Sequence, residues 1–367
     1  MAERGQIVEL ASRDKRHAGV LVTLVRAQGS SYRKAGARLL VVDGKYAGNI
    51  SGGCLEAEVV KKAPWAVRSG AIVERYSTAL EDTSDIPYGL GCGGTVDILL
   101  EPSGTPEFAA LLNALEESLR GAPATVITLL PSENAPMLRA VVSGGDVVFR
   151  SDRLETSTID AALAGEVDHA FVERLAPPQR LIVLGAGDDA RPLVRMAALL
   201  GWSVTVVDGR KQLARAERFP EAQRVLALRA GSMPEIGIHA DDAVVLMTHS
   251  YEQDREWLPA VLPLAPRYLG VLGARHRSSL LVSEASAITG LSIPECCARI
   301  FAPVGLDLGG DGPEAIALAI MAEAQACCMG RLAGSRRLTP ADVLTQGSRG
   351  DTSQYIQAQC ALEQSTD

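Results

Sequence analysis

One stretch of the chain, residues 180–210, constrains the fold more than any other. An apolar run over residues 181–184 ends in Gly185-Ala186-Gly187, and a pattern with helical periodicity follows. A second apolar run, over residues 204–207, ends in Asp208, 21 residues after Gly187. A buried strand, a glycine turn, a helix, a second strand and then an acid form the βαβ pattern of dinucleotide-binding domains. The stretch therefore predicts a Rossmann-like, doubly wound parallel sheet.

Four residues of this predicted domain are candidates for binding a dinucleotide or a phosphate. Gly185 permits the tight turn, and Gly187 lets the backbone approach a pyrophosphate. Asp208 suits the ribose hydroxyls of NAD, whereas Arg210 leaves NADP open. Arg275 follows a later predicted strand and is a candidate for a phosphate contact, although a solvated surface charge explains it equally well.

Asp188 and Asp189 make the ligand of this domain uncertain from sequence. They fall in the first turn of the predicted helix, where their charge suits the helix dipole but repels an incoming pyrophosphate. Two interpretations remain: a nucleotide site, or a scaffold whose helix is capped by its own carboxylates. His249 follows the strand predicted over residues 243–247 and is a candidate proton carrier. The capping-box pattern of residues 250–253 explains the same stretch as a helix start.

The N-terminal part reads as short strands separated by glycine turns, so we expect a mixed α+β domain before the Rossmann-like one. A helix is predicted over residues 55–63, with Pro64 as its end, and Pro177-Pro178 marks the start of the Rossmann-like domain. The predicted organisation is an α/β protein with an N-terminal domain, a connecting α+β segment, a Rossmann-like domain and a polar tail, over residues 1–105, 106–178, 179–334 and 335–367.

Two cysteines are flanked by glycines, Cys54 in Ser51-Gly52-Gly53-Cys54 and Cys92 in Gly91-Cys92-Gly93-Gly94. Cys54 begins a predicted helix, where free amides and the dipole favour a thiolate, and glycine amides can approach an anion. The alternative is a pair of tight turns with small buried thiols. Neither cysteine has a partner at the spacing of a structural metal site.

Composition excludes several classes of protein. A net charge of −8 without a long basic run argues against nucleic acid as a partner. No apolar stretch is long enough to span a membrane, and the first residues lack the apolar core of a signal peptide, so we expect a cytoplasmic protein without membrane association. Seven scattered cysteines do not form a disulfide framework.

Several segments together resemble the XdhC/CoxI family. GSSYRKAGARLLV, GNISGGCLEAEVV and YGLGCGGTVDILLEP are similar to its N-terminal domain. LIVLGAGDDARPL, VTVVDGR, VVLMTH, LGVLGARHR and VGLDLGGDGPEAIALAI are similar to its Rossmann domain. Two positions depart from the family pattern, Tyr32 where proline is usual and Asp188 where histidine is usual.

The resemblance implies an accessory factor for molybdenum hydroxylases such as xanthine dehydrogenase or carbon monoxide dehydrogenase. Such factors bind molybdenum cofactor (molybdopterin), keep it available for sulfuration by a cysteine desulfurase and help to insert it, and a homodimer is expected. Cys54 and Cys92 then become candidate catalytic residues and ligands of the cofactor's molybdenum. The predicted molybdenum-cofactor cleft consists of Ser51, Gly52, Gly53, Cys54, Gly91, Cys92, Gly93 and Gly94.

Two alternatives remain open. The Rossmann-like segment and His249 fit an NAD(P)-dependent oxidoreductase. Cys54 and Cys92 together fit a thiol-redox protein. A cofactor-binding chaperone without turnover is the leading interpretation, and it leaves enzymatic activity undecided.

Overall fold

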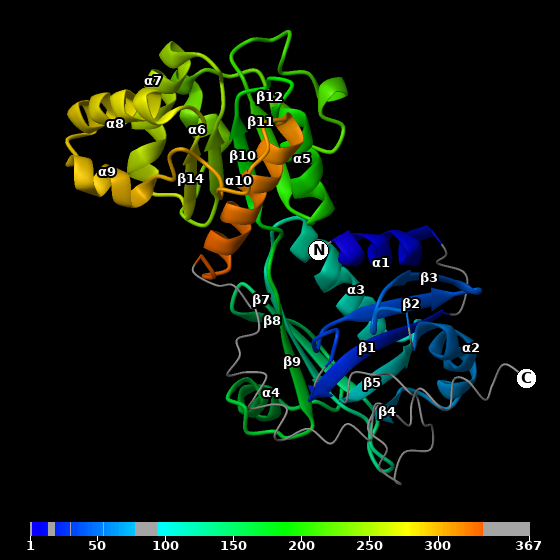
Figure 1. The fold of residues 1–367 in the computed structure, drawn as a ribbon. Helices are drawn as coiled ribbons and strands as arrows, with labels where there is room; N and C mark the ends of the chain where they lie inside the picture. The colour runs from blue at the N-terminus through cyan, green and yellow to red at the C-terminus, as the bar shows by residue number, and fades with distance from the viewer. Residues whose placement is uncertain (1, 14–18, 30, 54, 78–93, 333–367) are drawn as a thin grey trace, which may run out of the picture. The chain divides into compact units, whose positions relative to one another are not determined.

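A computed structural model describes residues 2–13, 19–29, 31–53, 55–77 and 94–332 (Figure 1). Within these ranges the chain forms two compact units that meet at Pro177-Pro178 in the sequence. The N-terminal unit takes residues up to 177, and the Rossmann unit begins at residue 178.

The Rossmann unit is built on a parallel sheet with the strand order β12-β11-β10-β13-β14. Phe301 forms a parallel bridge with Gly270 and so adds a sixth position beside β14. This is the strand order of a doubly wound dinucleotide-binding sheet, which confirms the predicted fold class. The strands are β10 (Arg180–Leu184), β11 (Ser203–Val207), β12 (Arg224–Leu226), β13 (Ala243–Leu246) and β14 (Tyr268–Val271).

Helices cover both faces of this sheet because successive strand residues point to opposite sides. Leu181 and Val183 pack with α5 and α10, whereas Ile182 and Leu184 pack with the helices of the other face. Figure 1 shows α5 and the orange α10 on one side of the strands and the yellow α7 and α8 on the other. The helices are α5 (Ala190–Leu199), α6 (Met233–Ile236), α7 (Tyr251–Val261), α8 (Arg275–Thr289), α9 (Ile293–Arg299) and α10 (Pro313–Cys328), with 3-10 turns at Ala216–Arg218, Ala230–Ser232 and Leu262–Leu264.

The N-terminal unit contains two antiparallel sheets, as expected for a mixed α+β domain. The five-stranded sheet has the order β3-β2-β1-β5-β4 and the four-stranded sheet the order β8-β7-β6-β9. The first consists of β1 (Gly19–Gln28), β2 (Arg38–Val42), β3 (Lys45–Gly48), β4 (Ile72–Ser77) and β5 (Thr95–Pro102). The second consists of β6 (Ala124–Leu129), β7 (Leu138–Ser143), β8 (Asp146–Arg150) and β9 (Ala170–Leu175).

Helix α2 (Glu56–Ala66) covers one face of the five-stranded sheet through Leu55, Val59 and Ala63. On the other face, α1 (Ala2–Arg13) and α3 (Pro106–Leu119) share a core with residues of both sheets. Helix α4 (Thr156–Leu163) packs on the four-stranded sheet. The shared core makes the two sheets parts of one unit.

Two ion pairs connect the sheets through the interior of this unit. Arg139 of β7 donates to both carboxylate oxygens of Glu101 in β5, at 2.7 and 3.1 Å, and both side chains are almost completely buried. Arg38 of β2 pairs with Glu173 of β9. Paired and hydrogen-bonded charges of this kind fix the register between sheets, because either partner alone would be a buried uncompensated charge.

The predicted end of the helix at Pro64 is wrong. Helix α2 continues past Pro64 to Ala66, since a proline one turn from the end of a helix removes only one backbone hydrogen bond. Phe301 forms a single bridge, and Arg299 ends α9. A capping box between Ser292 and Glu295 starts that helix.

Candidate functional site

The glycine loop after β3 and the start of β5 lie at the same end of the five-stranded sheet. Arg38 pairs with Thr23 and Gly48 with Leu39, so the chain after Gly48 leaves toward the end of β1 at Gln28. Thr95, the first residue of β5, pairs with Gln28 at that same end. Of the predicted cleft residues, the structure therefore brings Ser51, Gly52, Gly53 and Gly94 to one end of the sheet. Cys54, Gly91, Cys92 and Gly93 lie outside the described residues.

Glu56, the first residue of α2, holds the glycine loop in place. Its Oε1 accepts hydrogen bonds from the amides of Ile50 (2.9 Å) and Ser51 (2.8 Å). Its Oε2 accepts from the Gly53 amide (2.9 Å) and from the Ser51 hydroxyl. Burial raises the pKa of this carboxyl, but the bonds from Ser51 and Ile50 outweigh it and leave the pKa below the usual value.

The loop amides are consequently occupied, contrary to the expectation that they are free for an anion. The Gly52 amide donates to Asn49 Oδ1 at 3.0 Å, and the Leu55 amide donates to Ser51 Oγ at 2.9 Å. The other three amides, those of Ile50, Ser51 and Gly53, donate to Glu56. All described amides from Ile50 to Leu55 therefore donate to side chains. In the described part of the loop, no amide between Ile50 and Gly53 is left free for an anion.

Tyr32 adds an aromatic surface to the glycine loop. A Cβ added to Gly52, whose φ is +104°, would lie 3.0 Å from Cδ1 of the Tyr32 ring. Glycine at this position therefore lets the ring rest against the loop backbone. The ring is 74% exposed, so most of it faces solvent.

Sequence reasoning did not single out Glu56. The available signal was its position three residues after Gly53 at the start of a predicted helix, which matches the acidic half of a capping box. What the pattern could not indicate is that the carboxylate also binds Ile50 and Ser51, because those contacts depend on the path of the loop.

In the Rossmann unit, the two glycines of the turn after β10 have different roles. A Cβ at Gly185 would lie 2.3 Å from the Met247 carbonyl oxygen, and the residue has φ +126°. Gly185 is thus required by the close approach of β10 and β13, independently of any ligand. A Cβ at Gly187 would lie 2.7 Å from Oδ1 of Asp189. The space beside Gly187 is taken by a carboxylate of the protein itself.

Neither acid caps the helix, so that interpretation is wrong. Helix α5 begins at Ala190, and its N-cap Asp189 makes no capping hydrogen bond. Asp189 Oδ2 instead lies 2.5 Å from Nε2 of His249, and Asp188 pairs with Arg218 at 2.9 Å. His249 has φ +59° and a 59% exposed side chain. A non-glycine residue in this conformation is held there by its surroundings, as residues at ligand sites often are.

Asp208 is 1% exposed and fully engaged. It accepts from the Ala186 amide at 2.8 Å and from the Arg210 amide at 2.8 Å. The Arg210 guanidinium donates to both of its oxygens, at 2.9 and 2.7 Å. Although burial raises the pKa of Asp208, these bonds hold it below the usual value. The carboxylate expected to meet a ribose is neutralised within the protein.

The remaining predicted residues lie at the carboxyl edge of the same sheet. Ser250 is the N-cap of α7 and accepts from the Gln253 amide at 3.4 Å, which confirms the predicted helix start. Arg275 is the first residue of α8, is exposed, and forms no ion pair with any described residue. Its neighbour Arg277 instead pairs with the buried Asp254 at 2.6 Å.

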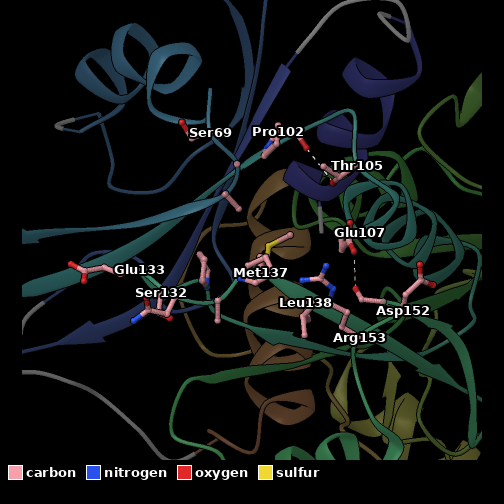
Figure 2. Close-up of a pocket in the computed structure, with 17 residues that line it drawn as sticks. Ser69, Pro102, Thr105, Glu107, Ser132, Glu133, Met137, Leu138, Asp152 and Arg153 are labelled. Atoms are coloured by element: carbon pink, nitrogen blue, oxygen red, sulfur yellow. Dashed lines mark hydrogen bonds between the residues drawn. The ribbon is translucent and has the colours of Figure 1, made fainter.

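A cavity of about 640 Å³ lies at the other end of the five-stranded sheet (Figure 2). Ser69 precedes β4 and Pro102 ends β5, so this cavity is remote from the glycine loop. Glu107 lines it and accepts from the Ser151 hydroxyl at 2.8 Å, drawn as the dashed line below the Glu107 label in Figure 2. No predicted site residue lines it.

Over the described ranges, no group of three His, Cys, Asp or Glu side chains is arranged to hold a metal ion. A search of the same residues finds no helix with the length and apolar character to cross a bilayer.

Comparisons with known proteins match both units. Residues 12–77 match the model of the XdhC and CoxI family, and residues 181–324 match that of the XdhC Rossmann domain. The chain is 30% identical over 312 residues to a probable xanthine dehydrogenase subunit from Bacillus subtilis, covering 83% of this chain and 91% of that protein. It is 28% identical over 312 residues to the molybdenum cofactor insertion chaperone PaoD of Escherichia coli, covering 83% and 81%.

The fold is also that of a solved relative. A crystal structure described as a xanthine dehydrogenase from Bacillus halodurans superposes with a TM-score of 0.78 at 27% identity, covering 94% of this chain and 100% of that one. The strand order, the glycine loops and these similarities agree, and the chain belongs to the XdhC and CoxI family.

Proposed function

We propose that this chain is an accessory factor that binds molybdenum cofactor and assists its sulfuration and insertion into a xanthine dehydrogenase-type molybdenum hydroxylase. The observation that carries the proposal is the Ser51–Gly53 loop, which Glu56 locks at the end of the sheet where β5 begins. Similarity to a molybdenum cofactor insertion chaperone supports the same role.

The cofactor is cargo in this proposal, and the described residues fit part of it. The pyrimidine ring of its pterin is flat, and the exposed Tyr32 ring beside Gly52 offers a surface for stacking. Its phosphate does not suit the loop, because the amides of Ser51, Gly52 and Gly53 already donate to side chains. We therefore assign the loop to positioning the residue that follows Gly53, and not to binding phosphate.

That residue is Cys54, and we propose that it acts with Cys92 as a ligand for the cofactor's molybdenum. Gly91, Gly93 and Gly94 complete the proposed cleft. A cysteine desulfurase as sulfur donor, a xanthine dehydrogenase-type client, a homodimeric state and a cytoplasmic location all belong to the same proposal.

The test is cofactor retention. The chain is co-expressed with an intact molybdenum-cofactor pathway, and molybdenum and pterin are measured per purified chain. We expect near-stoichiometric cofactor in the wild type and a loss of at least about tenfold in a Cys54→Ala, Cys92→Ala double variant, since a metal–thiolate ligand contributes well over 1.4 kcal/mol. Cys297→Ala is the matched control, because Cys297 is an exposed thiol on α9.

Unchanged retention in the double variant contradicts the proposed cleft. A wild-type protein without cofactor that binds NADH or NADPH favours the oxidoreductase alternative, for which the contact between His249 and Asp189 is the one supporting observation. A disulfide between Cys54 and Cys92 after mild oxidation, detected by mass spectrometry, favours the thiol-redox alternative.

A further inference from the structure

Three positively charged residues follow the ends of β11 and β12 on the Rossmann unit. Val207 pairs with Leu226, and the Asp208 amide donates to the Leu226 carbonyl at 3.1 Å. The chains that continue from the two strands therefore stay side by side at the carboxyl edge of the sheet. A Cβ at Gly209 would lie 3.0 Å from Cγ and 3.7 Å from Nε of Arg229. Arg210, Lys211 and Arg229 lie along this edge.

The negative charge of Asp208 does not balance the positive charges of all three residues. Asp208 is buried, and both of its oxygens accept from Arg210. Lys211 and Arg229 are exposed and form no ion pair with any described residue. Arg210 is itself 34% exposed and engages Asp208 through Nε and Nη2, with Nη2 also donating to the Thr248 carbonyl. Its Nη1 makes no hydrogen bond within the described chain.

The position of these side chains determines which group of a nucleotide they meet. In a doubly wound sheet of this order, the residues after the second strand face the adenine ribose of a bound dinucleotide. A free carboxylate there accepts hydrogen bonds from the two ribose hydroxyls, whereas arginine accommodates a 2′-phosphate. Asp208 has no oxygen to spare, and the surrounding guanidinium groups and ammonium are suited to a phosphate.

We propose that this edge of the Rossmann unit binds the 2′-phosphate of an adenine nucleotide, so that the unit selects the 2′-phosphorylated over the unphosphorylated form. Lys211 and Arg229 contact the phosphate. Arg210 contacts it through Nη1, while its Nε and Nη2 neutralise Asp208. The inference concerns the Rossmann unit alone and is independent of molybdenum-cofactor binding at the glycine loop.

The two acids near the turn after β10 do not prevent this binding mode. Asp188 is paired with Arg218 and Asp189 contacts His249, so their charges are partly compensated. Whatever repulsion they exert acts on the 5′-phosphate. Two nucleotides that share this phosphate and differ only at the 2′ position therefore isolate the proposed contact.

The experiment compares 2′,5′-ADP with 5′-AMP by isothermal titration calorimetry on the full chain. We expect 2′,5′-ADP to bind at least about tenfold more tightly at low salt, the fold-change that one charge-assisted hydrogen bond supplies. The preference should shrink as salt is raised, since the contact is electrostatic and exposed. In a Lys211→Gln, Arg229→Gln double variant we expect most of the preference to be lost, because only Arg210 then remains to contact the 2′-phosphate, with the affinity for 5′-AMP unchanged.

The control is Arg331→Gln, which removes an exposed charge just after the C-terminal end of α10 and should leave the preference intact. Both charges of the double variant are on exposed side chains, and an unchanged thermal unfolding curve checks that it folds. Equal affinities of the wild type for the two nucleotides, binding of neither, or an undiminished preference in the double variant each overturn the inference.

Discussion

Replacing Glu56 with glutamine tests whether the carboxylate, and not the glycine sequence alone, fixes the loop. Glutamine keeps the shape but offers only one oxygen to the four groups that now donate to two. In the better orientation, its Oε1 still accepts from Ile50 and Ser51, and its Nε2 donates to the Ser51 hydroxyl. The Gly53 amide then faces a donor and loses its partner.

The cost follows from these contacts. Gly53 is exposed, so water can replace the lost acceptor, and losing this charge-assisted hydrogen bond costs about 1 kcal/mol. The two amide bonds that remain change from charge-assisted to neutral, and each weakens by about 0.5 kcal/mol. Local opening of the loop should therefore become easier by about 2 kcal/mol. At 1.4 kcal/mol per factor of ten, this is a loss of protection of about 30-fold.

Hydrogen exchange of the peptide that spans residues 48–58, followed by mass spectrometry, measures this protection. Glu58→Gln is the matched control, because Glu58 lies in the same first turn of α2 but accepts no hydrogen bond from the described loop residues. We expect the control to exchange as the wild type does. Equal exchange of the Glu56→Gln variant and the wild type at neutral pH would refute the reasoning.

The same assay has a pH dependence with a defined sign. Because the pKa of Glu56 is lowered by folding from its ordinary value of 4.5, its stabilisation is fully present above pH 4.5. It is lost as the pH falls from there through the lower folded value. Protection of the wild-type loop, corrected for intrinsic exchange rates, should decrease over that range, and that of Glu56→Gln should not.

Two further predictions concern stability. Glu101→Gln leaves Arg139 buried and unpaired and should destabilise the N-terminal unit by about 3–5 kcal/mol, measured by hydrogen exchange of the β5 and β7 peptides in increasing urea. Glu101→Leu with Arg139→Met should recover most of the loss. A fully stable Glu101→Gln protein contradicts this. Gly185→Ala places a Cβ 2.3 Å from the Met247 oxygen at φ +126° and should lower the free energy of unfolding by about 3 kcal/mol or more. The control is Gly231→Ala, whose added Cβ meets nothing within 4 Å. Equal melting temperatures of the two variants would exclude the proposed clash.

Local signals in the amino-acid sequence are enough to predict the Rossmann unit and the approximate places of its site residues. Hydrophobic periodicity and glycine turns act over short stretches, and parallel strands put their carboxyl ends at one edge, so His249, Asp208 and Arg275 could be placed at that edge without coordinates. The glycine loops could be predicted from local sequence too, because clusters of glycine mark tight turns and backbone conformations with positive φ.

What those residues do at the edge depends on contacts between distant parts of the chain. Asp208 is a plausible ribose ligand in the sequence, but in the fold Arg210 and the Ala186 amide occupy it. Asp189 fits a helix cap by position, yet its contact is His249, 60 residues away. Likewise, the sequence pattern suggests that the amides of the glycine loop are free to bind an anion. In the structure, the amides of Ile50, Ser51 and Gly53 donate to Glu56. A pattern indicates which groups a segment carries, but whether a donor or acceptor remains free depends on partners that only the folded chain brings within hydrogen-bonding distance.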